Sequence, residues 1–232
     1  MTETATTTTR VDWRDALRWY TCETLSCKAI KFVGGLYFRA VAAVECVDFH
    51  HIPATGPCVV ASNHVSNLDV CYLALYLPRH PHFMAKVELF KNPVVAWGIR
   101  KCGAFPVHRG ESDAWAMRQA GQVLADGQLL CMFPEGTRSK GKAELRRGKV
   151  GAVKLALDYG VPLIPLAVTG THDFRVRGWR GHKITLQAAP PVDVAALAGS
   201  PPYQPDTLRE LTAQLMQRIA AMLPPAQRGV YG

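Results

Sequence analysis

The pattern that most constrains the fold is an alternation of short apolar segments with helix-like segments, which runs from about residue 58 to the C-terminus. The apolar segments are too short for helices and have the length of buried strands. Such alternation is typical of an α/β protein with a mostly parallel sheet, because parallel strands need crossover connections and helices usually supply them. The predicted strands are residues 58–62, 82–86, 104–107, 128–133, 162–168 and 183–189, and the predicted helices are 69–77, 88–101, 113–125, 149–159 and 206–222.

Three residues help to place the ends of these segments. Ser112 is expected to cap the helix at 113–125, because a serine hydroxyl can accept a hydrogen bond from a free backbone N–H. Gly160 is expected to end the helix at 149–159. Pro165 has no backbone N–H to donate, so it predicts a sheet edge or a bend.

The chain has 232 residues, which is enough for one sizeable core and shows no internal repeat or linker. We therefore expect a single α/β domain at residues 41–232. The polar, low-complexity run at 1–10 has little to bury and is expected to be a disordered tail. Residues 11–40 are expected to form a pair of amphipathic helices, at 12–26 and 28–40.

The sequence leaves open what these two N-terminal helices do. They could pack on the core, or they could anchor the chain at a membrane surface, since their aromatic residues lie beside Lys28, Lys31 and Arg39. No segment has the roughly 18 continuous apolar residues of a membrane-spanning helix. The seven cysteines have no paired spacing and no signal peptide is evident, which favours reduced thiols in an intracellular protein.

The positive charge of the chain is local. The net charge is +9, and residues 86–110 contribute +4 while 138–154 contribute +6, so the rest of the chain carries −1. Local basicity indicates an anionic partner, which could be nucleic acid, a phospholipid surface or a phosphorylated substrate. We expect no nucleic acid, because no helix-turn-helix, zinc or RNA-recognition signature is present. We also expect no metal, because the eight histidines lack ligand spacing.

Polar or glycine-rich groups follow four of the predicted strands, and in open α/β sheets chemistry gathers beyond the carboxyl ends of strands. After the first strand come His64 and Asp69. With His64 in the loop and Asp69 in the first turn of the next helix, the carboxylate could orient the imidazole as a general base. The alternative is a loop histidine beside an acid that favours a helix start. Ser66 is an expected cap, so we identify no nucleophile, and the histidine would activate a substrate hydroxyl.

Two further strand ends could bind an anion. Arg109 follows one strand, and a Glu135-Gly136-Thr137-Arg138 turn follows another. Glycine lets a ligand approach the backbone, and N–H groups with arginine suit phosphate. Glu135 would instead orient an arginine or a hydroxyl. The alternative is an ordinary polar turn.

Four blocks together give the chain a family resemblance. They are NHVSNLD (63–69), GAFPVHRG (103–110), FPEGTRS (133–139) and VPLIPLAV (161–168). In residues, order and spacing they resemble the glycerolipid acyltransferases of the 1-acylglycerol-3-phosphate acyltransferase type, over about 44–191. The resemblance argues against the two alternatives given above, a loop histidine beside a helix-start acid and an ordinary polar turn. It implies that residues 41–232 form an acyltransferase domain.

The resemblance implies a reaction and a set of site residues. His64 would be the general base and Asp69 would orient it, so that a lysophospholipid hydroxyl attacks the thioester of acyl-CoA or acyl-carrier protein without an acyl-enzyme. No cofactor is implied, and Pro165 would shape the acyl path. The residues implied to bind the glycerol phosphate are Lys86, Arg109, Glu135, Gly136, Thr137 and Arg138.

One position departs from the family pattern: His108 stands where an acid usually precedes the arginine. The acceptor could therefore be glycerol 3-phosphate, another lysophospholipid or a lyso-aminolipid. A non-catalytic membrane-binding module is the other class of hypothesis. Because both substrates have lipid tails, we expect the helices at 11–40 to face the bilayer and the protein to be peripheral on the cytoplasmic side of a membrane.

Overall fold

The computed structural model describes residues 12–109, 113–139, 143–173 and 182–232, so the expected tail at 1–10, Gly110 and Ser112 lie outside it. Its centre is a seven-stranded sheet in the order β1-β7-β6-β2-β5-β3-β4, parallel except between β6 and β7. The strands are β1 Ala43–Val47, β2 Cys58–Ser62, β3 Pro81–Lys86, β4 Ala104–Val107, β5 Leu129–Met132, β6 Leu163–Thr169 and β7 Lys183–Ala188. The helices are α1 Leu25–Val41, α2 Leu68–Tyr76, α3 Pro93–Lys101, α4 Ala114–Ala125, α5 Gly151–Tyr159, α6 Val194–Ala198 and α7 Pro205–Met222.

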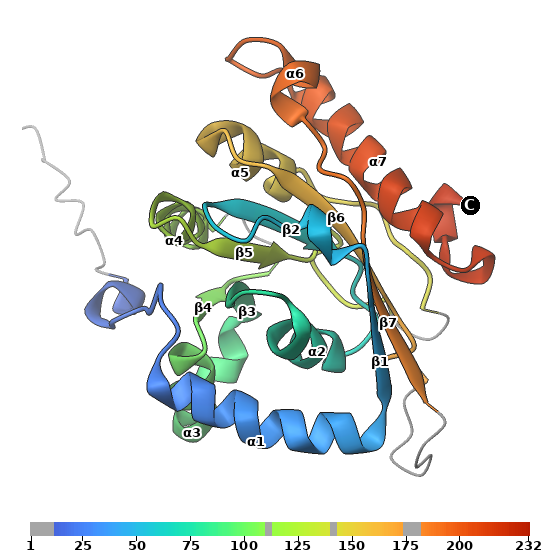
Figure 1. Cartoon of the computed structure of the whole chain (residues 1–232). Coiled ribbons are helices and arrows are strands. Elements are labelled where there is room, and N and C mark those ends of the chain that lie inside the picture. The colour runs from blue at the N-terminus through green and yellow to red at the C-terminus, as the bar shows by residue number, and fades with distance from the viewer. Residues whose placement is uncertain (1–11, 110–112, 140–142, 174–181) are drawn as a thin grey trace, which may run out of the picture.

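Helices cover both faces of the sheet (Figure 1), and an apolar core lies between the sheet and the helices on each face. Successive strand residues point to opposite faces, so Val59 joins the core beneath α4, α5 and α7, while Val60 joins the core beneath α2. Both side chains are fully buried. This double burial explains why the central strands read as continuous apolar runs in the sequence.

The predicted α/β class and its mostly parallel sheet are confirmed, and each of the six predicted strands is present within a residue or two. The sequence analysis missed β1 and the short helix α6. β1 pairs only with β7 at the sheet edge and leaves most of its side chains exposed or half-buried. A half-exposed edge strand has no apolar run, so the signal used for the other strands was absent.

The predicted helix at 12–26 is wrong, whereas the one at 28–40 lies within α1. Residues Trp13–Ala16 form a 3₁₀ turn, and α1 begins only after Thr24, whose hydroxyl accepts a hydrogen bond from the N–H of Cys27. Between them, Trp19 packs edge-on against Trp115, with ring centroids 5.4 Å apart. Tyr20, which with Trp13 and Leu17 gave the helical spacing, also contacts a distant residue, because its hydroxyl accepts a hydrogen bond from Nζ of Lys101 at 2.6 Å. Contacts with distant parts of the chain therefore replace the predicted helix.

The interpretation of Pro165 as an edge residue is also wrong, because β6 lies between β2 and β7. Pro165 pairs with Ala61 of β2, and it falls just before the antiparallel ladder with β7 that starts at Leu166. Its carbonyl still accepts a hydrogen bond from the N–H of Ala189. The proline is tolerated because the β6–β7 ladder begins only at the next residue.

Candidate active site

The loop after β2 and the first turn of α2 bring His64 and Asp69 together. Nδ1 of His64 lies 2.8 Å from Oδ2 of Asp69, and the two residues are 3% and 0% exposed. The pairing expected from the sequence is therefore formed: His64 lies in the loop, and Asp69 is the second residue of the helix. Burial and this hydrogen bond together hold the imidazole of His64 and the carboxylate of Asp69 in one orientation.

The Asp69 carboxylate is held by more than the histidine. Oδ2 also accepts hydrogen bonds from the backbone N–H groups of Val65 and Ser66, each at 2.8 Å. Oδ1 accepts a hydrogen bond from the hydroxyl of Thr171, which follows β6. Because both oxygens have donors, the carboxylate is fixed in place and has no freedom to turn away from the imidazole.

The position of Asp69 determines which imidazole nitrogen is available. With Nδ1 donating to the carboxylate, the neutral ring carries its acceptor lone pair on Nε2. Among the described residues, nothing hydrogen-bonds to Nε2. The ring of Phe133 stacks on the imidazole at 4.0 Å between centroids and 19° between planes. Phe133 therefore limits the tilt of the ring, and Nε2 is left to meet a ligand.

Glu135 ties the histidine loop to the basic segment that follows. Its Oε1 accepts the backbone N–H of His64 at 2.7 Å, and its Oε2 accepts that of Arg146 at 3.0 Å. Burial raises the pKa of this carboxyl from its ordinary value of 4.5 to about 7. With both oxygens occupied by backbone donors, Glu135 suits a positioning role better than the direct phosphate contact that the resemblance implies.

A cavity of about 170 Å³ lies at the carboxyl ends of β3, β4 and β5, and His64 is connected to it through Phe133 and does not itself line it. Phe133, which stacks on His64, forms part of its wall, and Arg109, Gly136 and Lys149 form part of its polar side. Gly136 has φ +70°. Cε of Lys149 lies only 3.0 Å from the point that a Cβ on this residue would occupy. Glycine therefore lets the lysine lie flat against the loop.

The cavity has a cationic rim: Arg109 and Lys149 line the cavity, and Arg138, which does not line it, lies near Arg109. Burial, and then the positive charge of Arg138, lower the pKa of Arg109. Neither arginine has an ion-pair partner in the part of the chain that the structure describes. The nearby Glu88 carboxylate acts on Arg109 but forms its ion pair with Lys86, so within the described ranges the two arginines lack a close counter-charge of the kind that a bound anion would supply.

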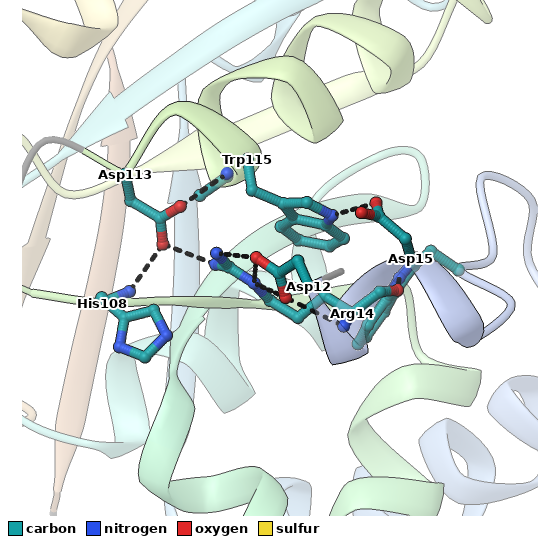
Figure 2. Close-up of polar contacts among 8 residues, drawn as sticks. Asp12, Arg14, Asp15, His108, Asp113 and Trp115 are labelled. Carbon is teal, nitrogen blue, oxygen red and sulfur yellow. Dashed lines mark hydrogen bonds and ion pairs between the residues drawn. The ribbon is translucent and has the colours of Figure 1, made fainter. Parts of the chain in front are cut away.

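A buried network holds the Arg109 loop in place, as Figure 2 shows. The carboxylate of Asp113 accepts the backbone N–H of His108 at 2.8 Å and pairs with the guanidinium of Arg14 at 2.6 Å. Arg14 is 6% exposed and is also paired with Asp12. Asp113, not Ser112, thus caps α4 among the described residues. The N-terminal segment therefore supports the loop on which Arg109 lies.

The remaining predicted site residues lie at different distances from this centre. Lys86 ends β3 and pairs with Glu88 at 3.0 Å, both exposed. Thr137 is half-buried in the loop between Gly136 and Arg138. Pro165 is buried in β6 and is not among the residues that line the cavity. The structure thus brings His64, Asp69, Glu135 and the arginines together, and leaves Pro165 inside the sheet.

Sequence reasoning missed Thr171, Phe133 and Lys149 as members of the site. Thr171 follows a strand, as the other site residues do, so the strand-end rule had a signal for it. Lys149 lay in the basic stretch without any mark to separate it from its neighbours. Phe133 looked like the end of an apolar strand, and only the fold reveals that it stacks on the histidine.

A second, larger groove of about 1310 Å³ lies on the other side of Glu135. It is lined by basic residues of the segment before α5 and by the C-terminal segment. The lining residues are Glu135, Ser139, Glu144, Leu145, Arg146, Arg147, Lys149, Pro225, Ala226, Gly229 and Val230. Lys149 borders both hollows, so a ligand that occupies both would pass this lysine.

Comparison with known proteins identifies relatives of this chain. The model of the protein family described as Acyltransferase matches residues 43–169. The chain is 32% identical to the 1-acyl-sn-glycerol-3-phosphate acyltransferase of Bacillus subtilis, over 76% of this chain and 86% of the relative. It is 35% identical to a chloroplastic enzyme of the same name from Brassica napus, over 54% of this chain but only 36% of the relative.

A solved structure has the same fold. The crystal structure of the 1-acyl-sn-glycerophosphate (LPA) acyltransferase PlsC from Thermotoga maritima superposes with a TM-score of 0.65 at 29% sequence identity. The match covers 82% of this chain and 76% of that one.

Proposed function

Since the chain belongs to the acyltransferase family, as an enzyme of the lysophosphatidic acid acyltransferase type, we propose that it acylates 1-acyl-glycerol 3-phosphate. The acyl donor is acyl-CoA or acyl-carrier protein, and the product is phosphatidic acid. The observation that carries this proposal is the buried His64–Asp69 pair beside a cavity with a cationic rim. A base and an anion site side by side are what acylation of a phosphorylated alcohol requires.

In the proposed mechanism, Nε2 of His64 takes the proton of the free acceptor hydroxyl. The hydroxyl oxygen attacks the thioester carbonyl, and the C–S bond breaks as the new C–O ester bond forms. The imidazolium then returns its proton to the leaving thiolate, so the enzyme ends as it began. Asp69 keeps Nδ1 protonated and stabilises the transient imidazolium. No covalent acyl-enzyme is needed, because the thioester is already activated.

Recognition of the acceptor is assigned to the cationic rim. Arg109 and Arg138 would hold the phosphate, and Lys149 at the edge of the same cavity would add a third cation. Lys86 shares its charge with Glu88, so we assign it a weaker role. His108, which stands where the family usually has an acid, lines the cavity. It could therefore change which acceptor is preferred, and glycerol 3-phosphate and other lysophospholipids are the alternatives.

The donor's anionic carrier would lie in the large groove with Arg146 and Arg147. Coenzyme A brings phosphates and a carrier protein brings an acidic surface, and both suit guanidinium groups. Glu135 accepts hydrogen bonds from the backbone N–H groups of both His64 and Arg146, so the same carboxylate would position the base and the groove that binds the donor.

Peripheral attachment to a membrane is part of the proposal. α1 and α3 lie side by side (Figure 1), and both expose large apolar side chains. Within the described residues, no helix has both the length and the apolar character to cross a bilayer. An exposed apolar face beside lysine and arginine suits a lipid surface. The exposed residues are Leu25, Ile30, Phe32, Val33, Leu36, Tyr37, Val94, Val95 and Trp97.

The decisive experiment is an acyl-transfer assay with one acyl-CoA and a panel of acceptors. Lysophosphatidic acid should be the best substrate, and monoacylglycerol, which lacks the phosphate, should react poorly. A preference for monoacylglycerol would remove the phosphate site from the proposal. Liposome binding without transfer to any acceptor would instead support a non-catalytic membrane module.

A further inference from the structure

A cluster of metal-binding side chains lies away from the candidate active site, where the start of α1 meets the end of α3 and the chain before β3. Glu23, Cys27 and His80 each offer one ligand atom, and these atoms lie within 4.8 Å of one another. The Cys102 thiol, at the C-cap of α3, lies beside that of Cys27, but it is outside the set of ligand atoms that all lie within 4.8 Å of one another. The four residues come from three separate segments, so spacing along the chain did not reveal them.

The distances within the cluster suit a shared ion better than direct hydrogen bonds. Sγ of Cys27 is 3.9 Å from Nδ1 of His80, and Oε1 of Glu23 is 3.8 Å from the same nitrogen. An N–H···O hydrogen bond needs about 3.2 Å or less. With Zn–N near 2.0 Å and Zn–S near 2.3 Å, tetrahedral ligand atoms lie roughly 3.3–3.8 Å apart.

The imidazole of His80 is otherwise poorly satisfied. Its side chain is 9% exposed, and Nε2 is buried without a hydrogen-bond partner among the described residues. The best contact of Nδ1 is the weak one to the sulfur of Cys27. A buried imidazole without a good partner is costly, and a metal bond to Nδ1 would offset that cost.

The charges also balance around a divalent ion. Two thiolates and one carboxylate exceed the charge of Zn²⁺ by one, and the ammonium of Lys31 lies 3.0 Å from Oε1 of Glu23. The same Oε1 is the oxygen near Nδ1 of His80, and its two lone pairs would let it bind a metal and keep this ion pair. Sulfur and imidazole ligands together favour zinc over magnesium or calcium.

We propose that Cys27, His80 and Glu23 form a structural Zn²⁺ site, with the neighbouring Cys102 as the fourth ligand once its side chain turns toward the ion. Four protein ligands leave no open position, which is typical of structural zinc. The site would join α1 to α3 and to the chain before β3, beside the hydrogen bond from the Thr24 hydroxyl to the carbonyl of Lys101 at 2.9 Å. It would thereby fix the orientation of the two helices with exposed apolar faces.

The test uses the full chain, freed of metal by a chelator and then titrated with Co²⁺ or Zn²⁺. We expect about one equivalent to bind and Co²⁺ to give the thiolate charge-transfer band of a tetrahedral site. Cys27→Ser and His80→Ala should abolish the band and the zinc content. Cys22→Ser, which removes an exposed thiol of the same segment, should change neither.

The wild-type titration decides the matter even if a ligand variant folds poorly. A wild-type chain that binds neither ion, or that binds Co²⁺ without a thiolate band, overturns the proposal. So does a Cys27→Ser variant that retains its zinc. The proposal is also overturned if freshly purified, metal-free protein contains a disulfide between Cys27 and Cys102 and still binds no zinc after that disulfide is reduced.

Discussion

The buried His64–Asp69 pair and the cationic rim are neighbours, but they are built in opposite ways. The pair is almost inaccessible to solvent, and the Asp69 carboxylate accepts hydrogen bonds from three groups besides the imidazole. The rim arginines, Arg109 and Arg138, have no carboxylate partner in the described part of the chain. The pair has its hydrogen-bond partners within the protein, whereas under the proposed function the rim arginines gain their counter-charge from a bound anion.

This difference separates two jobs. A general base must be held at a fixed angle, and internal hydrogen bonds do that without substrate. A binding site for an anion must keep its cations free, because a carboxylate partner would compete with the phosphate. Changes in the pair should therefore alter the chemical step, and changes in the rim should alter substrate affinity.

The largest effect is expected for His64→Ala. Loss of the base should lower kcat by roughly 10³-fold, with little change in KM for the phosphorylated acceptor. Steady-state kinetics with acyl-CoA and lysophosphatidic acid give both values, and circular dichroism checks the fold. His50→Ala, at an exposed histidine, is the control. Near-normal turnover in His64→Ala would mean that another group removes the proton.

A smaller loss of kcat is expected for Asp69→Asn. The amide keeps the shape but cannot accept all the bonds that the carboxylate accepts, and it does not stabilise an imidazolium. We expect a loss of roughly 10²-fold in kcat, the low end of what positioned acid–base groups contribute, together with a shift in the pH profile of kcat. An unchanged pH profile with the same loss would indicate a purely structural role for Asp69.

Arg109→Ala tests the cationic rim, and it should raise KM with little effect on the chemical step. Loss of a charge-assisted contact to phosphate should raise KM for lysophosphatidic acid by roughly 10-fold to 100-fold. The reaction with monoacylglycerol should be unaffected, since it has no phosphate to lose. Arg209→Ala, at an exposed arginine of α7, is the matched control. Equal losses with both acceptors would place Arg109 outside the phosphate site.

A different kind of effect, separate from the chemical step, is expected for Glu135→Gln, measured as stability against pH. The folded-state pKa of about 7 lies above the ordinary 4.5, so the unfolded chain ionises first as pH rises. Glu135 should therefore lower the free energy of unfolding progressively between about pH 4.5 and 7, by at most about 3 kcal/mol. Above pH 7 the contribution should be constant.

Urea unfolding of the wild type and Glu135→Gln at pH 5, 6, 7 and 8 measures this slope. The free energy of unfolding of the wild type minus that of the variant should fall from pH 5 to pH 7. Parallel profiles would show that the carboxyl is ionised in the folded protein throughout this range, held so by its two backbone donors.

The sequence by itself determined the alternation of strands and helices and the strand-end position of His64, Asp69, Arg109 and Glu135. These features are local, because apolar periodicity and turn residues act over a few positions. The N-terminal residues 12–26 were mispredicted for the same reason: the spacing of Trp13, Leu17 and Tyr20 is helical, but this segment forms contacts with Lys101 and Trp115, far along the chain.

The tertiary structure alone decided which distant residues complete each site. Thr171 reaches Asp69 because β6 lies beside β2, and Glu135 reaches the backbone of His64 because β5 lies on the other side of β2. Cys27 and His80 meet only where α1 crosses the start of β3. Strand order and helix packing set these contacts through burial of the whole core, and no local stretch of sequence contains that information.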